Sequence, residues 1–315
     1  EPGYLMHTAI LINGSPGRVA DEATALGLIL FDCGVDPHDF ARAKKRACGR
    51  SNIFAGIGLH PWWLADGRYG NAEINLLCEV AAQERYIGEV GLDFSARFAG
   101  SEPLQIQALN RLCDALVQHP LTGRVNQFTP FVRQEPYWTS SNRMDYHPNP
   151  DSPAIIFHWF SGTSDELTRA RNAGCYFSVN ERMLATKRGR EYARQIPLDR
   201  LLLETDAPAE PNTETSAQSL IRSLTRTSER ITSLKNCDAK RIESIVLTNA
   251  RSFLTFANPW CAKNAKYEYC YRNGYISFNF PTARIILDCP LIKAFTVIHP
   301  AFSQILNPSR RSNHV

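Results

Sequence analysis

Histidine and carboxylate residues stand at the ends of successive apolar runs in this sequence. The run Ala154–Phe157 leads into His158, another leads through Glu204 to Asp206, and the segment YIGEV contains Glu89. Imidazole nitrogen and carboxylate oxygen are common ligands of divalent metals. A metal held by such residues lowers the pKa of a bound water and polarises a phosphoryl or carbonyl oxygen. The pattern therefore favours a divalent-metal site that could activate a bound water.

Taken singly, each of these residues has an explanation that involves no chemistry. His60, which follows the run FAGIG, precedes Pro61 and could shape a turn. Glu89 could pair with an arginine, His158 could be a hydrogen-bonded core histidine, and Asp206 could be an ordinary turn residue. Their recurrence at matching places on consecutive runs favours one shared site.

The elements that would carry these residues alternate along the chain. The apolar runs are short and apolar on both faces, as parallel strands are when helices cover both sides of the sheet. The predicted strands are 28–32, 54–58, 86–90, 154–158, 175–179 and 201–204, and amphipathic segments predict helices over 19–26, 39–48, 72–83, 103–118, 164–173 and 184–195. Such alternation indicates a barrel or a doubly wound sheet, in which sites lie at the carboxyl ends of the strands.

Bulk properties are those of an ordinary globular protein. The chain has 315 residues and a formal charge of +4, which neither demands nor excludes a nucleic-acid partner. No apolar stretch is long enough to span a membrane, and the first residues lack the pattern of a signal peptide. The nine cysteines are scattered without a CxxC pair. We therefore expect reduced thiols and a cytoplasmic location.

Four motifs in order give the sequence a family resemblance. GLHPWW (58–63), IGEVGLDF (87–94), FHWFSGT (157–163) and LLLETDAP (201–208) resemble the motifs of TatD-type metal-dependent hydrolases, members of the amidohydrolase-like superfamily. The resemblance covers roughly residues 16–125 and 152–256. The HWFSGT form looks most like the TatD relatives of Qat anti-phage operons, which implies partners from a defence operon.

The resemblance implies a (β/α)₈ TIM-like barrel and a deoxyribonuclease that uses two divalent ions, with Mg, Mn and Zn not distinguished. Glu89 resembles the glutamate that bridges the two metals, and His158 resembles the histidine that binds the second. Asp206 resembles the aspartate that binds the first metal and orients or deprotonates the attacking water. His60 looks like the histidine that lines the substrate pocket. DNA is the implied substrate.

The sequence lacks part of the ligand set that this family uses. The family has His-x-His on its first strand, but the early part of this chain has only His7. A further histidine, in a strand of the type Ser-Ile-His-Ser, is missing near residues 126–151. Glu89, His158 and Asp206 alone give neither metal more than two protein ligands, whereas catalytic sites commonly have three. The resemblance thus implies an impaired enzyme.

Two explanations of the missing ligands are open. With suitable synonymous codons for Tyr4–Ile12, a shifted reading frame encodes Phe-Asp-Ala-His-Cys-His-Leu-Asp, the family's first strand. The same shift from Asn126 encodes Ser-Ile-His-Ser-Leu-Arg-Ala-Ala. Small insertions or deletions in the coding DNA would explain both segments, and also the unusual tail. The other explanation is a diverged paralogue that lost its ligands by ordinary substitution.

We expect a barrel domain over residues 1–257, with a perturbed first strand and a perturbed region at 126–151, followed by an irregular tail over 258–315. The favoured function is a metal-dependent hydrolase. One alternative is a catalytically inactive barrel that binds nucleic acid or a partner protein. A second is a barrel hydrolase of amides or lactones.

Overall fold

The computed structural model describes residues 16–119, 125–129, 154–207 and 215–254, and three strands within residues 268–288. The expected perturbed first strand, within residues 1–15, lies outside the described residues. So does the expected perturbed region, apart from its first four residues.

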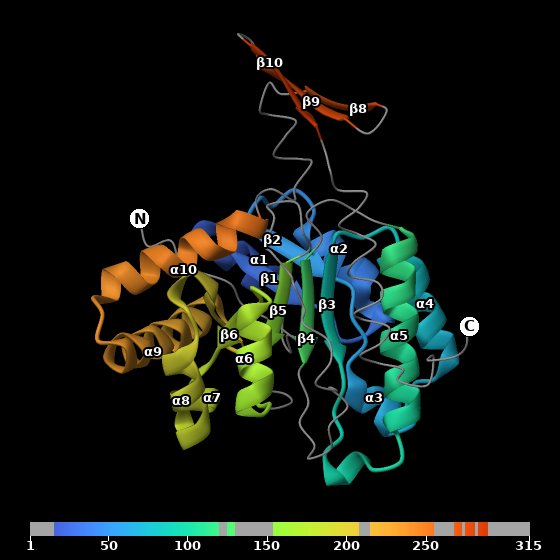
Figure 1. Cartoon of the computed structure of the whole chain (residues 1–315), viewed down its shortest axis with the longest axis horizontal. Coiled ribbons are helices and arrows are strands. Elements are labelled where there is room, and N and C mark those ends of the chain that lie inside the picture. Colours follow the sequence, from blue (N-terminus) through green and yellow to red (C-terminus); the bar gives the residue numbers. More distant parts are fainter. Residues whose placement is uncertain are drawn as a thin grey trace, which may run out of the picture.

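Parallel strands form the centre of the fold (Figure 1). Strands β1 (Leu30–Cys33) and β2 (Ile53–Gly56) pair with each other, and a parallel bridge from Ile57 to Ile87 joins β2 to the next strand. A parallel sheet then runs in the order β3-β4-β5-β6-β7. Its strands are Tyr86–Gly91, Val125–Thr129, Ala154–His158, Tyr176–Val179 and Leu201–Leu203. Neighbours in sequence are therefore neighbours in space, so the carboxyl ends of the strands share one edge.

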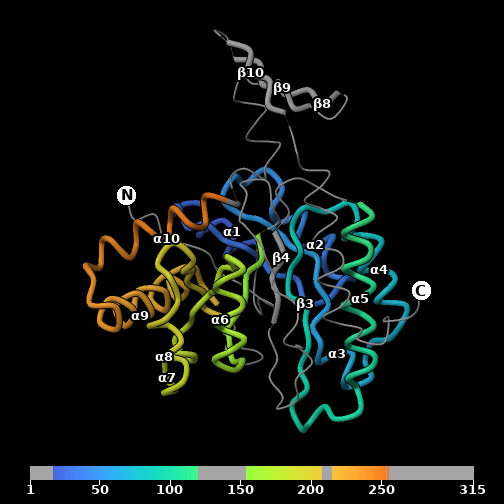
Figure 2. The backbone as a smooth tube through the Cα atoms, viewed as in Figure 1, coloured from blue at the N-terminus to red at the C-terminus, as the bar shows by residue number. Residues whose placement is uncertain are grey.

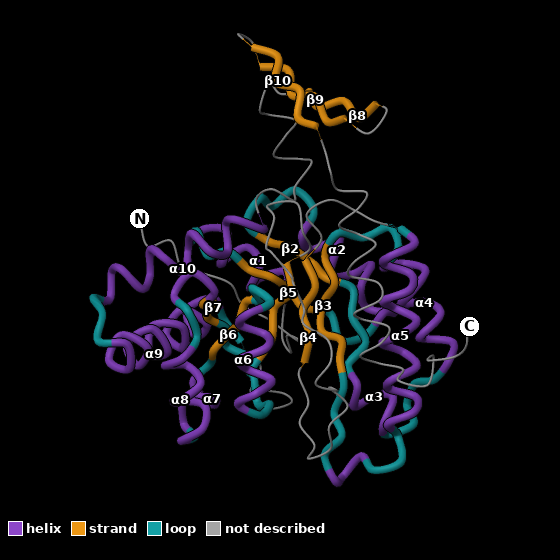
Figure 3. Tube along the Cα trace, viewed as in Figure 1, coloured by secondary structure: helices purple, strands orange, loops and turns teal. Residues whose placement is uncertain are grey.

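Helices lie outside the strands, with α3 to α5 on one flank and α6 to α9 on the other (Figure 3). Because helices cover the strands, the strands are apolar on both faces, as the sequence predicts. The helices are α1 (Pro16–Ala25), α2 (Phe40–Ala47), α3 (Pro61–Ala65), α4 (Asn71–Ala81), α5 (Glu102–Gln118), α6 (Ser164–Asn172), α7 (Glu181–Ala185), α8 (Lys187–Gln195), α9 (Ala217–Lys235) and α10 (Ala239–Leu254). Single 3₁₀ turns occur at Pro37–Asp39, Ala96–Phe98 and Leu198–Arg200.

The core joins the first described elements to the last ones. Val19 of α1 and Phe31 of β1 belong to the same buried apolar cluster as Phe177 of β6 and Leu202 of β7. The backbone N–H of Ala217, which begins α9, donates a hydrogen bond of 3.0 Å to the side chain of Glu22 in α1. Helices α1 and α9, far apart in the sequence, therefore contact each other, and Figure 2 colours the chain from α1, in blue, to α10, in orange. The strands thus curve enough to bring β1 and β7 into one core, although the described residues do not show a closed barrel.

Two expectations about irregular segments are wrong in part. Residues 126–129, expected to lack regular structure, belong to β4, which fills the place between β3 and β5. The tail, expected to be irregular, contains an antiparallel sheet of β8 (Glu268–Arg272), β9 (Tyr275–Phe280) and β10 (Ala283–Asp288). Asn273-Gly274 between β8 and β9 is a strong hairpin signal in the sequence.

Across the described part of the chain, none of the helices combines the length and the apolar character that crossing a membrane requires.

Candidate active site

Glu89 lies on β3, where its buried carboxylate is surrounded by closely packed backbone. The Glu89 N–H donates to the carbonyl of Gly34, and the Glu89 carbonyl accepts from the N–H of Leu59, both at 3.0 Å. A Cβ atom on Gly58 would lie 1.8 Å from the Gly34 oxygen, so only glycine fits there. These contacts fix the position of Glu89, whose exposure is only 2%.

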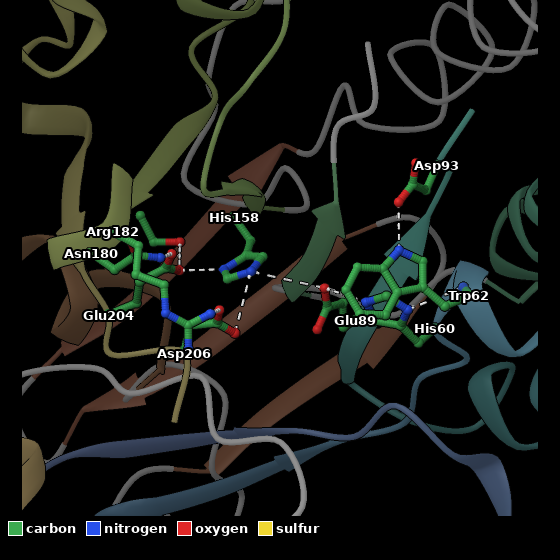
Figure 4. Close-up of polar contacts among 10 residues, drawn as sticks. His60, Trp62, Glu89, Asp93, His158, Asn180, Arg182, Glu204 and Asp206 are labelled. Atoms are coloured by element: carbon green, nitrogen blue, oxygen red, sulfur yellow. Dashed lines mark hydrogen bonds and ion pairs between the residues drawn. The ribbon is translucent and has the colours of Figure 1, made fainter. Parts of the chain in front are cut away.

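His60 connects the end of β2 to Glu89. Its Nδ1 accepts a hydrogen bond of 3.2 Å from the backbone N–H of Trp62 and so caps the short helix α3. Because Nδ1 is an acceptor, the ring proton is on Nε2, which lies 3.2 Å from Oε1 of Glu89. The Nε2 side of the His60 ring therefore faces the Glu89 carboxylate (Figure 4).

His158 ends β5 and is held from behind by a buried carboxylate. Nδ1 of His158 lies 2.6 Å from Oε2 of Glu204, which is fully buried. Glu204 also accepts hydrogen bonds from the Ser178 hydroxyl and, at 2.7 Å, from Nδ2 of Asn180. The contact between His158 Nδ1 and Glu204 directs Nε2 of His158 away from Glu204. Nε2 lies 3.9 Å from Oε1 of Glu89 and 3.7 Å from Oδ1 of Asp206.

Asp206 completes the row of residues in Figure 4. It follows β7 in a left-handed backbone conformation with φ of 52°. Its other carboxylate oxygen, Oδ2, lies 3.3 Å from Nη1 of Arg182, and the Arg182 guanidinium lies 5.6 Å from the centre of the Trp159 ring. Trp159, directly after His158, also has a positive φ, of 42°. Such strained residues persist where the surroundings enforce them, and they cluster at functional sites.

The carboxylates of the site shift the pKa values of its members. Burial alone would lower the pKa of His158, but the charges of Glu204, Glu89 and Asp206 outweigh it and raise the pKa to about 10. Burial, helped by the charges of Glu89 and Glu204, raises the pKa of Asp206 to about 6, against the opposing effect of His158. The His158 imidazolium thus balances part of the negative charge at the site.

The residues singled out in the sequence come together in the structure. Glu89, His158 and Asp206 face one another, and His60 contacts Glu89. Asn180 and Glu204 also follow apolar runs in the sequence, but that pattern gives neither of them a role. The sequence gives no functional signal for Ser178, a serine inside an apolar strand, and Arg182 is typical of a solvated helix face.

The donor types at the site fit a divalent cation. His158 offers an imidazole nitrogen, and Glu89 and Asp206 each offer carboxylate oxygens toward it, the set that such cations bind. Within the described ranges, no three histidine, cysteine, aspartate or glutamate residues are placed closely enough to hold an ion as they stand. Binding an ion would therefore require these side chains to rearrange.

Comparisons with known proteins agree on one family. A family model described as TatD related DNase matches residues 6–255. A 3′-5′ ssDNA/RNA exonuclease TatD from Citrobacter rodentium is 27% identical over 191 residues, which cover 58% of this chain and 66% of that protein. The aligned part thus spans just under two thirds of that relative.

Solved structures establish the fold. A TatD homologue from Escherichia coli K12 superimposes with a TM-score of 0.60 at 18% identity, covering 79% of this chain and 97% of that one. A TatD family hydrolase from Entamoeba histolytica gives a TM-score of 0.59 at 19% identity, with the same coverage. These likenesses place the chain in the TIM-barrel type of α/β fold.

Proposed function

The chain belongs to the family of TatD-related DNases, and from that membership we propose that it is a divalent-metal-dependent hydrolase that cleaves phosphodiester bonds in DNA. The observation that carries the proposal is the convergence of Glu89, His158 and Asp206. Nε2 of His158 lies within 3.9 Å of an oxygen of each carboxylate, although the three residues come from β3, β5 and the segment after β7. Chemistry of this kind sits at the carboxyl ends of barrel strands.

We assign each residue a role that its surroundings support. Glu89, His158 and Asp206 would hold the metal, and a bound divalent ion would supply Lewis-acid chemistry to water and to the phosphoryl group. Glu89 would be the ligand shared by two ions, the role that the resemblance implies, and its carboxylate faces both His60 and His158. Asp206, which is more exposed than Glu89 and His158, would orient or deprotonate the attacking water. His60 would line the substrate pocket, with its Nε2 facing Glu89.

We propose that the missing histidine ligands weaken metal binding in this chain. The reading-frame explanation and the divergence explanation both concern segments that, apart from residues 126–129 of β4, lie outside the described residues. Resequencing the coding DNA across codons 1–16 and 120–153 separates the two explanations. Restored His-x-His and Ser-Ile-His-Ser segments would support a complete two-metal enzyme. An unaltered frame would support a paralogue with a reduced ligand set. Mg, Mn and Zn are all candidates for the ion.

A barrel that binds nucleic acid without cutting it is the second candidate. Arg182 lies 3.3 Å from Asp206, and the protonated His158 balances the neighbouring carboxylates, so the site reaches partial charge balance with protein groups alone. A site of this kind could bind a nucleic acid or a partner protein through the same face.

Other aspects of the proposal rest on the sequence. The family model ends at residue 255, which supports a barrel domain over 1–257 and a separate tail over 258–315. We also propose a closed eight-stranded barrel and a cytoplasmic location. The FHWFSGT motif supports a place in an anti-phage operon, with protein partners from that operon.

The test uses the whole chain and a single-stranded oligonucleotide labelled at its 5′ end. Products are separated on a denaturing gel after incubation with Mg²⁺, Mn²⁺ or Zn²⁺, or with EDTA. We expect cleavage with at least one metal, none with EDTA and none by the Glu89→Gln variant. Glu79→Gln, which alters an exposed glutamate of α4, is the matched control and should cleave normally. Undiminished cleavage by Glu89→Gln would refute the role of Glu89, and binding without cleavage would favour the second candidate.

A further inference from the structure

Trp62 is exposed beside the candidate active site. Its exposed fraction is 42%, and with Leu26 it is one of the large hydrophobic side chains left exposed in the described part of the chain. It lies in α3, directly after His60 and Pro61. Exposing an indole to water is unfavourable, so aromatic rings of this size are normally buried. Its position therefore calls for an explanation.

The indole is held in place by polar contacts at its edge. Nε1 of Trp62 donates to the carboxylate of Asp93, and the other oxygen of that carboxylate accepts from the N–H of Ser95 at 2.8 Å. The buried side chain of Gln105 bonds both the N–H of Asp93, at 2.6 Å, and its carbonyl, at 2.9 Å. Trp62 is thus fixed through its ring edge, so the ring is presented in a preset orientation without being buried.

Two more flat groups stand against the indole. The guanidinium of Arg97 lies 4.1 Å from the centre of the Trp62 ring and 4.3 Å from that of Phe98. The two rings are 5.8 Å apart. Arg97, like Trp62, is exposed. An exposed cluster of aromatic rings and arginine is the arrangement on which unpaired nucleic-acid bases stack, and the arginine also attracts the phosphate backbone.

The cluster continues directly into the row of candidate catalytic residues. The rings of Trp62 and His60 meet edge to face with their centres 4.8 Å apart, and His60 contacts Glu89 at 3.2 Å. Figure 4 shows Trp62 at one end of the row and Arg182 at the other, with Glu89 and His158 between them. A base placed against Trp62 would have its phosphate within reach of the site.

We propose that Trp62, Arg97 and Phe98 form a stacking platform that binds an unpaired base next to the phosphodiester bond to be cut. This inference rests on the proposed function and assigns to it the residues that would distinguish an unpaired base from a paired one. A base inside a duplex is stacked on its neighbours, so it cannot also lie on Trp62 unless it unpairs. The platform therefore selects single strands, because only an unpaired base exposes a face for stacking. Since every base has such a face, the selection does not depend on the nucleotide sequence.

The neighbouring tryptophan provides a matched control. Trp63 packs against Tyr69, with ring centres 5.3 Å apart, and the guanidinium of Arg68 lies 4.9 Å from its ring. Trp63 therefore has an arginine contact similar to that of Trp62 but only intermediate exposure. Within the described residues, its ring contacts are with Tyr69 and Arg68 and not with His60.

The experiment measures binding apart from cleavage. The whole chain is titrated into a fluorescein-labelled oligo-dT in EDTA, and fluorescence anisotropy gives the Kd. A labelled duplex is titrated in parallel. We expect Trp62→Leu to weaken binding to the single strand by about 5- to 150-fold, the effect of losing one stacked base. Trp62→Phe should weaken it less, and Trp63→Leu should bind as the unaltered chain does. Circular dichroism confirms that each variant is folded.

The outcomes separate the platform from the proposed function. Equal single-strand affinity in Trp62→Leu and Trp63→Leu would overturn the platform, as would failure of the unaltered chain to bind the oligonucleotide. If Trp62→Leu loses affinity but the unaltered chain does not cleave with any metal, the platform stands and the hydrolase proposal fails. Equal weakening of duplex and single-strand binding by Trp62→Leu would overturn the selection of unpaired bases.

Discussion

The buried carboxylate of Glu204 lies 2.6 Å from Nδ1 of His158 and so directs the opposite ring nitrogen toward Glu89 and Asp206. A partner of this kind fixes the orientation of an imidazole and raises its basicity as a ligand. Glu204 itself faces away from the row in which a substrate would lie. It therefore acts through His158, as a positioning residue.

Glu204→Gln keeps the shape of this side chain and removes its charge. We expect the variant to fold and to lose about 10- to 100-fold in metal affinity or cleavage rate, the usual effect of removing the partner of a ligating histidine. Initial cleavage rates and Mn²⁺ titration provide the measurement, with the melting temperature as a check on folding. Unchanged metal affinity and rate in a folded variant would show that Glu204 is a structural residue only.

Gly58 packs against the backbone that positions Glu89, so Gly58→Ala should disturb the site through the fold. A Cβ at this position would lie 1.8 Å from the Gly34 oxygen and 2.7 Å from the Glu89 oxygen, and these backbone atoms cannot rotate away. We expect a loss of about 1 to 3 kcal/mol in the free energy of unfolding, as for other overpacked positions. Urea denaturation measures it.

Gly17 provides the control for this prediction. Apart from its chain neighbours and the backbone of its own helix, α1, no atom of the described residues lies within 4 Å of a Cβ placed there. Gly17→Ala should therefore leave the free energy of unfolding unchanged or raise it by no more than about 1 kcal/mol. If both variants are equally stable, close packing at Gly58 does not constrain β2 and β3.

Much of the site could be predicted because polar residues at the ends of apolar runs are visible in the sequence. The predicted strand 154–158 matches β5, and its last residue, His158, faces Glu89 as parallel strands require. Trp62 was missed, because an aperiodic segment such as GLHPWW does not show which aromatic ring is buried. The exposure of Trp62 depends on Asp93, which is distant in sequence.

The helix boundaries show a second limit. The predicted helix 184–195 is divided in the structure into α7 and α8 at Thr186, which has extended backbone angles and whose hydroxyl accepts from the N–H of Gly189. A threonine within a periodic segment can either continue a helix or cap a new one, and tertiary contacts decide between them. Periodicity alone therefore gave one helix where there are two.

If Asp206 binds a metal as proposed, Arg182 would compete with the ion for its carboxylate, so removal of Arg182 should strengthen metal binding. Nη1 of Arg182 lies 3.3 Å from Oδ2 of Asp206, with the arginine side chain 40% exposed. An ion pair of this exposure is worth about 0.2 to 1 kcal/mol. We expect Arg182→Gln to raise the Mn²⁺ affinity by up to about 5-fold, measured by titration calorimetry. Arg188→Gln, on the exposed side of α8, should have no effect. A lower affinity in Arg182→Gln would show that Arg182 supports the site.

Glu181 ties α7 to α9 and should make the stability depend on acid pH. Its carboxylate accepts two hydrogen bonds of 2.8 Å from Arg226 and one of 2.6 Å from Ser223. Burial raises the pKa of Glu181, but the hydrogen bonds from Arg226 and Ser223 outweigh burial and hold the pKa below its ordinary value of 4.5. The unfolded chain therefore binds a proton on Glu181 at a higher pH than the folded chain does.

Because the folded pKa is the lower one, the contribution of Glu181 is present above pH 4.5 and is lost as the pH falls through the folded pKa. Arg226 is 53% exposed, so solvent limits the contribution to about 0.2 to 1 kcal/mol. Urea denaturation at pH 7 and pH 3.5 measures it: Glu181→Gln should lose more stability at pH 7 than at pH 3.5, while Glu79→Gln should match the unaltered chain at both. An equal loss of stability at both pH values would mean that the contact does not depend on the charge of Glu181. The loss of an ionic contact would be larger at pH 7, where the carboxylate is charged.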